Sequence, residues 1–347
     1  MSTEQASAGQ ADGSRAVFYR EADADRAALA GQTVAVVGYG NLGRSMALNL
    51  RDSGLRVLVG NIRDEFRAQA LADAFDTRDI GEAVAAADVV YLLVPDEVIP
   101  EVFREQVEPA LRDGAAVVFG SGYVLAYDLV KPPAGVDVLL LAPRMLGEEV
   151  RRTYVEEAGF LSYLSVEQDA SGTAKDRLLA LASAAGSLQR GALELSARQE
   201  AMLDLFVEQT VGPYLGTAFQ LAFHVGTQAG LPPEALVCEL YMSGEMSRTI
   251  QTMAEVGFYQ SVTWHGLVAT YGGFTGTLAI DKEAMQRYFT ERLEYIRSGG
   301  FARALQEEEA GGYPTLAAIE AITKVANPLT DAEERIRAAL DPRSAAE

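Results

Sequence analysis

The sequence predicts an α/β fold, a doubly wound parallel sheet, followed by a second domain that is wholly helical. Short apolar runs alternate with helical segments over about the first 150 residues, as in parallel sheets covered by helices on both faces. After about Lys175 the strand-like runs stop, and long segments carry apolar residues at i, i+3, i+4 and i+7. A length of 347 residues is enough for two domains.

The expected elements follow in order along the chain. Each apolar run ends at glycine or proline, and we expect buried strands at 33–38, 55–60, 87–95, 115–120 and 136–143. Helical spacing predicts helices at 43–54, 66–75 and 98–111, and 159–168 is expected as a further strand at the sheet edge. The segment 273–280 is expected to be a loop, with helix returning over 282–322.

These elements divide the chain into three parts. Residues 1–15 are small and polar, which predicts a disordered tail. The sheet domain is expected to occupy 16–174 and the helical domain 175–340.

Composition excludes several kinds of function. The net charge is -20, from 29 Lys+Arg and 49 Asp+Glu, so nucleic acid and anionic lipid are poor partners. One cysteine and two histidines exclude a disulfide framework, a zinc–cysteine site and a multi-histidine metal centre. No apolar run is long enough to span a bilayer, and no signal peptide is visible in the first 30 residues. We therefore expect a cytoplasmic protein.

The segment GYGNLG, from Gly38 to Gly43, matches G-x-G-x-x-G and lies between a buried strand and a helix. In this setting Gly38 permits the tight turn, Gly40 lets backbone approach a pyrophosphate, and Gly43 lets the helix pack on the sheet. The pyrophosphate would lie at the positive end of the helix. A glycine-rich turn without a ligand is the simpler alternative, but the context favours a dinucleotide site.

The end of the second strand would contact the adenosine ribose, and its residues give a mixed signal. Asp64 and Glu65 would accept hydrogen bonds from a free 2′-hydroxyl, whereas Arg63 and Arg67 would favour a 2′-phosphate. A solvated helix start explains the acids equally well. The choice between NAD and NADP stays open at this point.

Over nearly everything after residue 15, the chain resembles the short form of ketol-acid reductoisomerase, also called acetohydroxy acid isomeroreductase. The matching segments include AVFYREADAD, GQTVAVVGYGNLG, LLVPDEV, VEQDASGTAKD, DLFVEQ and LEYIRSGGFARALQEEEAGGYP. The resemblance implies a Rossmann domain followed by a knotted helical domain that dimerises, with NADPH or NADH and two Mg²⁺ ions. Members of the family migrate an alkyl group in an acetohydroxy acid and then reduce the resulting 2-keto group.

By the resemblance, twelve residues are expected to bind the cofactor. They are Gly38, Tyr39, Gly40, Asn41, Leu42, Gly43, Arg63, Glu65, Arg67, Pro95, Asp96 and Gly147.

Two departures fall on the family's catalytic residues. The family has a catalytic histidine after the fourth strand, where this chain has Ser121, and serine cannot titrate near neutral pH. A family lysine after the fifth strand is replaced by Arg144, which stays charged but exchanges no proton readily.

The family's acidic metal ligands are kept only in part. Asp204 and Glu208 stand at i and i+4 on one helix face, where the family has its first pair, although a solvated acidic face is an equal alternative. The second pair comes from the partner subunit in the family. Only one of its two positions is kept here, by Glu239 or by Glu245 depending on the alignment.

The only tryptophan, Trp264, and His265 stand together in SVTWHG, where the family pocket would lie. His265 is a candidate replacement acid/base, although a histidine without a role is the more common case. The expected catalytic residues are Ser121, Arg144, Asp204, Glu208 and His265, and the expected metal ligands are Asp204, Glu208, Glu239 and Glu245.

The cofactor half of the site is kept and the metal half is eroded. This predicts an NAD(P)H-dependent oxidoreductase of specialised biosynthesis that reduces a small, anionic C=O or C=N substrate without isomerisation. One alternative is a true ketol-acid reductoisomerase of branched-chain amino-acid synthesis, and another is a catalytically dead, dinucleotide-binding paralogue. A homodimer or larger assembly is expected in each case.

Overall fold

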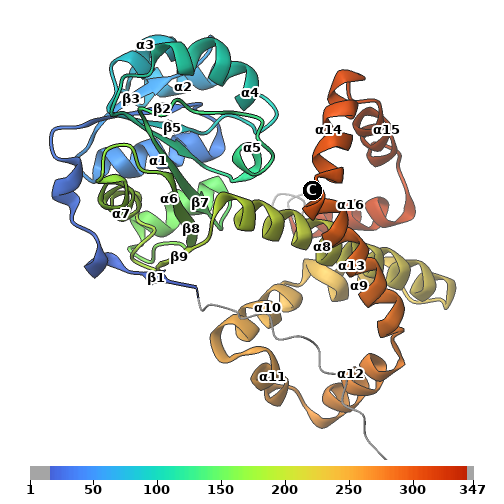
Figure 1. Cartoon of the computed structure of the whole chain (residues 1–347). Helices are drawn as coiled ribbons and strands as arrows, with labels where there is room; N and C mark the ends of the chain where they lie inside the picture. Colours follow the sequence, from blue (N-terminus) through green and yellow to red (C-terminus); the bar gives the residue numbers. More distant parts are fainter. Residues whose placement is uncertain (1–15, 342–347) are drawn as a thin grey trace, which may run out of the picture. The chain divides into compact units, whose positions relative to one another are not determined.

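The computed structural model describes residues 16–341, which form two units (Figure 1). The first unit extends to Leu203 and the second begins at Asp204. The tail expected at 1–15 lies outside the described residues. Among residues 16–341, no helix is both long and apolar enough to cross a membrane.

Within its described residues, the first unit contains a nine-stranded sheet in the order β4-β3-β2-β5-β6-β7-β8-β9-β1. The strands are β1 (Phe18–Tyr19), β2 (Thr33–Val37), β3 (Arg56–Gly60), β4 (Asp76–Arg78), β5 (Val89–Leu92), β6 (Ala116–Phe119), β7 (Asp137–Pro143), β8 (Ser162–Gln168) and β9 (Ala192–Glu194). From β4 to β7 all pairings are parallel. This part is the doubly wound sheet that the sequence predicts, and its strand order reverses between β2 and β5.

The far side of the sheet differs from the prediction. The strand expected at the edge, β8, lies inside the sheet, antiparallel to β7 and parallel to β9. The edge strand beyond β9 is β1, and the two are antiparallel. Strands of two or three residues have too few positions to show an alternating pattern, so β1 and β9 were not predicted.

The first unit also extends past the boundary expected at 174. Helix α7 (Ala174–Ala185) is almost wholly buried and packs on β7 and β8, and β9 continues the sheet after it. The helical spacing of α7 is the same whether a helix packs on a sheet or on other helices. The sequence pattern therefore placed the domain boundary too early.

Helices cover both faces of the sheet because its central strands are apolar on both faces. On one face α1 (Asn41–Asp52), α6 (Gly147–Val155) and α7 share a core with the strands. Helix α3 (Ile80–Ala85) packs on β2 and β3 and on the helical segment η3 (Phe103–Val107). The remaining elements are η1 (Glu21–Asp23), η2 (Arg26–Leu29), α2 (Glu65–Ala72), α4 (Ile99–Val102), η4 (Glu108–Ala110) and α5 (Tyr123–Ala126).

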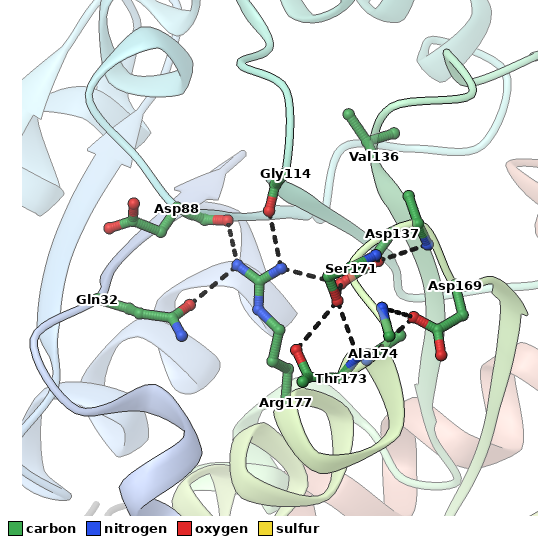
Figure 2. Close-up of polar contacts among 12 residues, drawn as sticks. Gln32, Asp88, Gly114, Val136, Asp137, Asp169, Ser171, Thr173, Ala174 and Arg177 are labelled. Carbon is green, nitrogen blue, oxygen red and sulfur yellow. Dashed lines mark hydrogen bonds and ion pairs between the residues drawn. The ribbon is translucent and has the colours of Figure 1, made fainter.

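Arg177 of α7 connects the amino ends of four parallel strands (Figure 2). Its guanidinium donates to the Gln32 side chain before β2, at 3.0 Å, and to the Asp88 carbonyl before β5, at 3.0 Å. It also donates to the Gly114 carbonyl before β6, at 2.9 Å, and pairs with the Asp137 carboxylate at the start of β7, at 2.9 Å. Since parallel strands run the same way, this cluster lies at the edge opposite their carboxyl ends.

The Asp137 carboxylate is fully buried and has further donors. Its Oδ1 accepts the backbone N–H groups of Ala170 and Ser171, both at 2.9 Å, and its Oδ2 accepts the Ser171 hydroxyl at 2.8 Å. Burial alone would raise the pKa of this carboxyl. The hydrogen bonds from Ser171 and Arg177 outweigh burial and hold the pKa below its usual range.

The second unit is helical throughout its described elements, and the boundary between the units falls within α8. The elements are α8 (Ala197–Gln228), α9 (Pro233–Val237), η5 (Cys238–Met242), α10 (Glu245–Val256), α11 (Phe258–Ser261), η6 (Val262–Trp264), α12 (Leu267–Ala279), α13 (Lys282–Arg297), α14 (Gly300–Ala310), α15 (Pro314–Thr323) and α16 (Pro328–Leu340). The loop expected at 273–280 is wrong, because most of it belongs to α12. Two glycines in that segment, Gly273 and Gly276, favoured a loop, but a single α-helix accommodates them.

Candidate functional site

The glycine turn between β2 and α1 has the geometry of a dinucleotide site. Gly38 has φ +94°, and a Cβ there would lie 2.7 Å from the Leu93 carbonyl oxygen. A Cβ on Gly43 would lie 2.0 Å from the Gly38 carbonyl oxygen, so this position also excludes any side chain. A Cβ on Gly40 would meet nothing within 4 Å. Gly38 and Gly43 are therefore required by packing, whereas Gly40 borders open space at the start of α1.

A groove of about 520 Å³ opens at this turn, along the carboxyl ends of β2, β3 and β5. It is lined by Gly38, Tyr39, Gly40, Asn41, Leu42, Asn61, Ile62, Asp64, Phe66, Ile80, Leu93, Val94, Pro95, Val98 and Val102. The groove lies at the point where the strand order reverses, which is where open α/β sheets bind ligands. The backbone N–H groups of the first turn of α1 have no partner within the helix and favour an anion. The residues present therefore fit a dinucleotide.

Gly147 belongs to the same turn through packing. A Cβ on this residue would lie 2.6 Å from the carbonyl carbon of Asn41 and from the backbone nitrogen of Leu42. The first turn of α6 therefore presses on the first turn of α1, and only glycine fits between them. Asp96 follows Pro95 at the end of the groove and is half-buried. Cofactor contact by either residue stays a prediction.

The charged residues expected at the ribose lie around the start of α2. Glu65 is in its first turn and lines a neighbouring hollow of about 620 Å³. Arg67 is mostly buried and its Nη1 pairs with Asp79 at 2.7 Å. Arg63 is the exposed one, and its nearest acidic oxygen is again on Asp79, at 4.0 Å. The two arginines therefore differ in how firmly they are held.

Ser121 lies just beyond the carboxyl end of β6, in the turn that leads to α5. Its hydroxyl oxygen accepts the backbone N–H of Tyr123 at 3.1 Å, so the side chain closes its own turn. The next residue, Gly122, is buried, and a Cβ there would lie 2.2 Å from the Ala197 carbonyl oxygen. This turn therefore packs directly on the start of α8.

Arg144 follows β7 and forms an ion pair with Glu200, with Nη1 to Oε1 at 2.9 Å. The other Glu200 oxygen accepts the backbone N–H of Gly122 at 2.7 Å. The arginine guanidinium carbon also lies 5.2 Å from the centre of the Tyr163 ring. Glu200 is buried and Arg144 is partly exposed. One carboxylate therefore contacts both strand ends at which the sequence predicts catalytic residues.

Sequence reasoning missed Glu200. A signal was present, because Glu200, Asp204 and Glu208 are spaced four residues apart and so lie on one face of α8. The first of the three belongs to the sheet unit and the other two to the helical unit. The approach of Asp204 and Glu208 to Arg144 stays a prediction.

The expected metal ligands do not form a complete site in the part of the chain that is described. Across residues 16–341, no three His, Cys, Asp or Glu side chains gather as ligands for one ion. Glu239 lies in η5 and Glu245 begins α10, with Gly244 at φ +82° breaking the helix between them. They belong to two helical segments, so the i, i+4 arrangement of the family's second pair is absent. The described donors of one chain therefore form no metal site by themselves, and metal binding by these residues stays a prediction.

His265 lies in the second unit, at the end of η6, beside a hollow of about 450 Å³. The other lining residues are Phe258, Tyr259, Val262, Ala269, Thr270, Gly273, Phe274 and Thr277, none of which is acidic. A catalytic imidazole normally has a neighbouring group that fixes its tautomer. The lining supplies no carboxylate for this purpose, so an acid/base role for His265 stays an unsupported prediction.

The fold and the glycine turn together define a dinucleotide-binding protein of the Rossmann type. Comparison with known families divides the chain into two matches. Residues 28–191 match the acetohydroxy acid isomeroreductase, NADPH-binding domain, and residues 198–341 match the ketol-acid reductoisomerase, C-terminal domain. The chain therefore belongs to the ketol-acid reductoisomerase family, and it is an NAD(P)-dependent oxidoreductase.

Individual relatives agree with this assignment. A putative ketol-acid reductoisomerase 3 of Saccharolobus solfataricus is 37% identical over 296 residues, covering 84% of this chain and 89% of the relative. A ketol-acid reductoisomerase (NADP(+)) of Caldivirga maquilingensis is 38% identical, covering 87% and 92%. The solved structure of an NADH-preferring ketol-acid reductoisomerase from an uncultured archaeon is 31% identical. It covers 92% of this chain and 98% of its own, with a TM-score of 0.87.

Proposed function

We propose that this chain reduces a small, anionic C=O or C=N substrate with a nicotinamide cofactor and does not catalyse the alkyl migration of its family. The observation that carries the proposal is the pair of strand ends at β6 and β7. Ser121 and the Glu200-paired Arg144 stand there in place of a titratable histidine and lysine. Migration needs metal ions that hold two adjacent oxygens, whereas hydride transfer needs a cofactor, a positioned acceptor and a proton source.

The residues present support a reduction. The bound nicotinamide supplies the hydride. Arg144 carries a fixed positive charge, and Glu200 and Tyr163 orient its guanidinium. Such a group holds a substrate carboxylate or phosphate but delivers no proton. Ser121 can donate a hydrogen bond to the oxygen or nitrogen that gains negative charge as hydride arrives, and solvent supplies the proton that completes the alcohol or amine.

We also propose that the chain works as a homodimer through its helical unit. Helix α12 contains no buried residue, and Leu267 and Val268 are 85% and 88% exposed. Helix α15 likewise buries none of its residues. Apolar faces of this extent are uncommon on soluble monomers, and a second copy of the chain would cover them. A mass of one chain by analytical ultracentrifugation at micromolar concentration would contradict this.

A comparison of two substrates tests the reaction. 2-Acetolactate must isomerise before it carries the 2-keto group that the family reduces, whereas 3-hydroxy-3-methyl-2-ketobutanoate already carries it. The product assayed is therefore 2,3-dihydroxy-3-methylbutanoate, which 2-acetolactate can give only after migration. We expect the purified chain, with Mg²⁺ and either nicotinamide cofactor, to turn over the second and not the first. Efficient turnover of 2-acetolactate would instead establish a true ketol-acid reductoisomerase. Cofactor binding without turnover of any 2-keto acid or imine would favour the dead paralogue.

Arg144→Ala tests the anchoring role. We expect KM for an anionic substrate to rise at least about tenfold, since a charge-assisted pair contributes more than 1.4 kcal/mol. Arg152→Ala is the matched control, because Arg152 is exposed and pairs only with Glu149 and Glu156 of its own helix. Equal kinetics in the two variants would remove Arg144 from the site.

A further inference from the structure

The groove beside the glycine turn includes the end of β3, the position that bears on the choice between NADH and NADPH. In Rossmann-type domains this strand end contacts the adenosine ribose, which carries a free 2′-hydroxyl in NADH and a 2′-phosphate in NADPH. Here the strand is followed by Asn61 and Asp64, which line the groove together with the glycine turn. The charges and hydrogen bonds of this segment therefore determine which cofactor fits.

Asp64 is fixed in place by the backbone around it. Its Oδ1 accepts the backbone N–H of Arg67 at 2.9 Å and the Asn61 amide at 2.8 Å. The Asn61 side-chain oxygen in turn accepts the backbone N–H of Tyr39 in the glycine turn, at 3.0 Å. The carboxylate is therefore a fixed acceptor in the groove, and within the described residues its Oδ2 accepts no hydrogen bond.

Both cations of the segment face an acid, but only one of them is held closely. Arg67 donates to the Asn61 carbonyl and to Asp79, both at 2.7 Å. Arg63 is 85% exposed and also faces Asp79, at 4.0 Å. With Asp64, Glu65 and Asp79 against these two arginines, the segment carries one net negative charge. Asp79 therefore holds Arg67 firmly, whereas its contact with the exposed Arg63 is weak.

The neighbouring hollow offers no free cation. It is lined by two arginines, Arg44 and Arg151. Arg44 is held by Asp73, with Nε to Oδ2 at 2.7 Å and Nη2 to Oδ1 at 3.2 Å. Arg151 pairs with Asp52 at 2.5 Å. A 2′-phosphate, with a charge of about −1.5 to −2 at pH 7, would meet the fixed Asp64 carboxylate, with only the exposed and unanchored Arg63 to offset the repulsion.

We propose that this chain binds NADH in preference to NADPH, with Asp64 accepting a hydrogen bond from the 2′-hydroxyl of the adenosine ribose. The proposal refines the nicotinamide cofactor of the proposed function and is independent of its substrate. It also differs from the NADPH named in the description of the matching domain family.

Dissociation constants measured with the full-length chain test the preference without relying on turnover. Isothermal titration with NADH and with NADPH, at one fixed ionic strength, should give tighter binding of NADH by about tenfold or more. This factor corresponds to one screened charge–charge repulsion at the ribose. Raising the salt concentration should narrow the difference, because screening weakens the repulsion of the phosphate.

Two substitutions separate the causes. Asp64→Ser keeps a helix-capping side chain but removes the charge, so NADPH binding should tighten and NADH binding should weaken. Asp79→Asn releases Arg63 and Arg67, so NADPH binding should tighten while NADH binding changes little. Glu105→Gln is the control for a lost negative charge, because Glu105 is exposed and outside the groove. It should leave the ratio of the two constants unchanged.

The outcomes distinguish this proposal from the one on the substrate. NADPH binding equal to or tighter than NADH binding would overturn the preference and leave the reduction chemistry untouched. Binding of neither cofactor would overturn both. An unchanged ratio in Asp64→Ser and Asp79→Asn, with circular dichroism showing folded chains, would remove this segment as its cause. Tight NADH binding without turnover of any substrate would support the preference alone.

Discussion

Replacing Arg177 by methionine should destabilise the sheet unit more than any other single loss of an arginine at its amino edge. The side chain is 8% exposed, and its partner Asp137 is fully buried. The substitution leaves the Asp137 carboxylate without its cation and the carbonyls of Asp88 and Gly114 without their donor. Removing one partner of a buried ion pair costs about 3–5 kcal/mol.

That loss should be visible as a change in melting temperature. For a unit of this size, 1 kcal/mol corresponds to about 2–4 °C, so about 4 kcal/mol corresponds to about 8–16 °C. Arg112→Met is the matched control, because Arg112 pairs with the neighbouring Asp88 but is 51% exposed. A surface pair contributes about 0–1 kcal/mol, so this control should lower the midpoint by less than about 4 °C.

Thermal unfolding followed by circular dichroism, with and without cofactor, measures both variants. A second substitution, Asp137→Leu, added to Arg177→Met should recover part of the loss, because the unpaired buried carboxylate is then gone. If Arg177→Met lowers the midpoint no more than Arg112→Met does, the four-strand connection contributes nothing and the reasoning is wrong.

Three further outcomes are expected. Gly40→Leu should weaken cofactor binding more than tenfold in a titration and leave the melting temperature unchanged, because a Cβ at this position meets no protein atom within 4 Å. Gly43→Ala should instead lower the melting temperature, because its Cβ would lie 2.0 Å from the Gly38 carbonyl oxygen. Hydrogen bonds hold the folded-state pKa of Asp137 below its usual value, so the ionised carboxylate stabilises the fold above about pH 4. This stabilisation is lost as the pH falls through the folded-state pKa. The difference in unfolding free energy between wild type and Asp137→Asn should therefore shrink on acidification, and a constant difference from pH 7 to pH 3 would contradict this. Val268→Glu should lower the mass measured by ultracentrifugation to that of one chain, and an unchanged dimer mass would place the interface elsewhere.

Strands β2, β3, β5, β6 and β7 were predictable from the sequence because each lies in an apolar run that ends at glycine or proline. The parallel edge strand β4 was not predictable, because its three residues are polar. The glycine turn was predictable for a related reason, since the roles of Gly38, Gly40 and Gly43 depend on local backbone alone. The helix at 267–279 was not predictable, because glycine content lowers helix propensity and only the folded unit shows that the segment is helical.

The ion pair between Arg144 and Glu200 could not be predicted from the local sequence, for a different reason. Glu200 is 56 residues away along the chain, and the contact exists because the turn at Gly122 packs on the start of α8. A sequence shows which charges it contains but not which of them neutralise each other. The same limit applies at the end of β3, where the sequence shows Arg63 and Arg67 but not that Asp79 lies beside both.

The position of Arg177 affects which parts of the sheet unit can tolerate substitution. It joins the strands at their amino ends, whereas residues 121 and 144 lie past the carboxyl ends of β6 and β7. In β7 the two ends are separated by a seven-residue strand, about 23 Å long. Substitutions at the reactive end therefore leave the register of the sheet intact. Residues 121 and 144 can therefore vary without loss of the contacts that stabilise the opposite edge of the sheet.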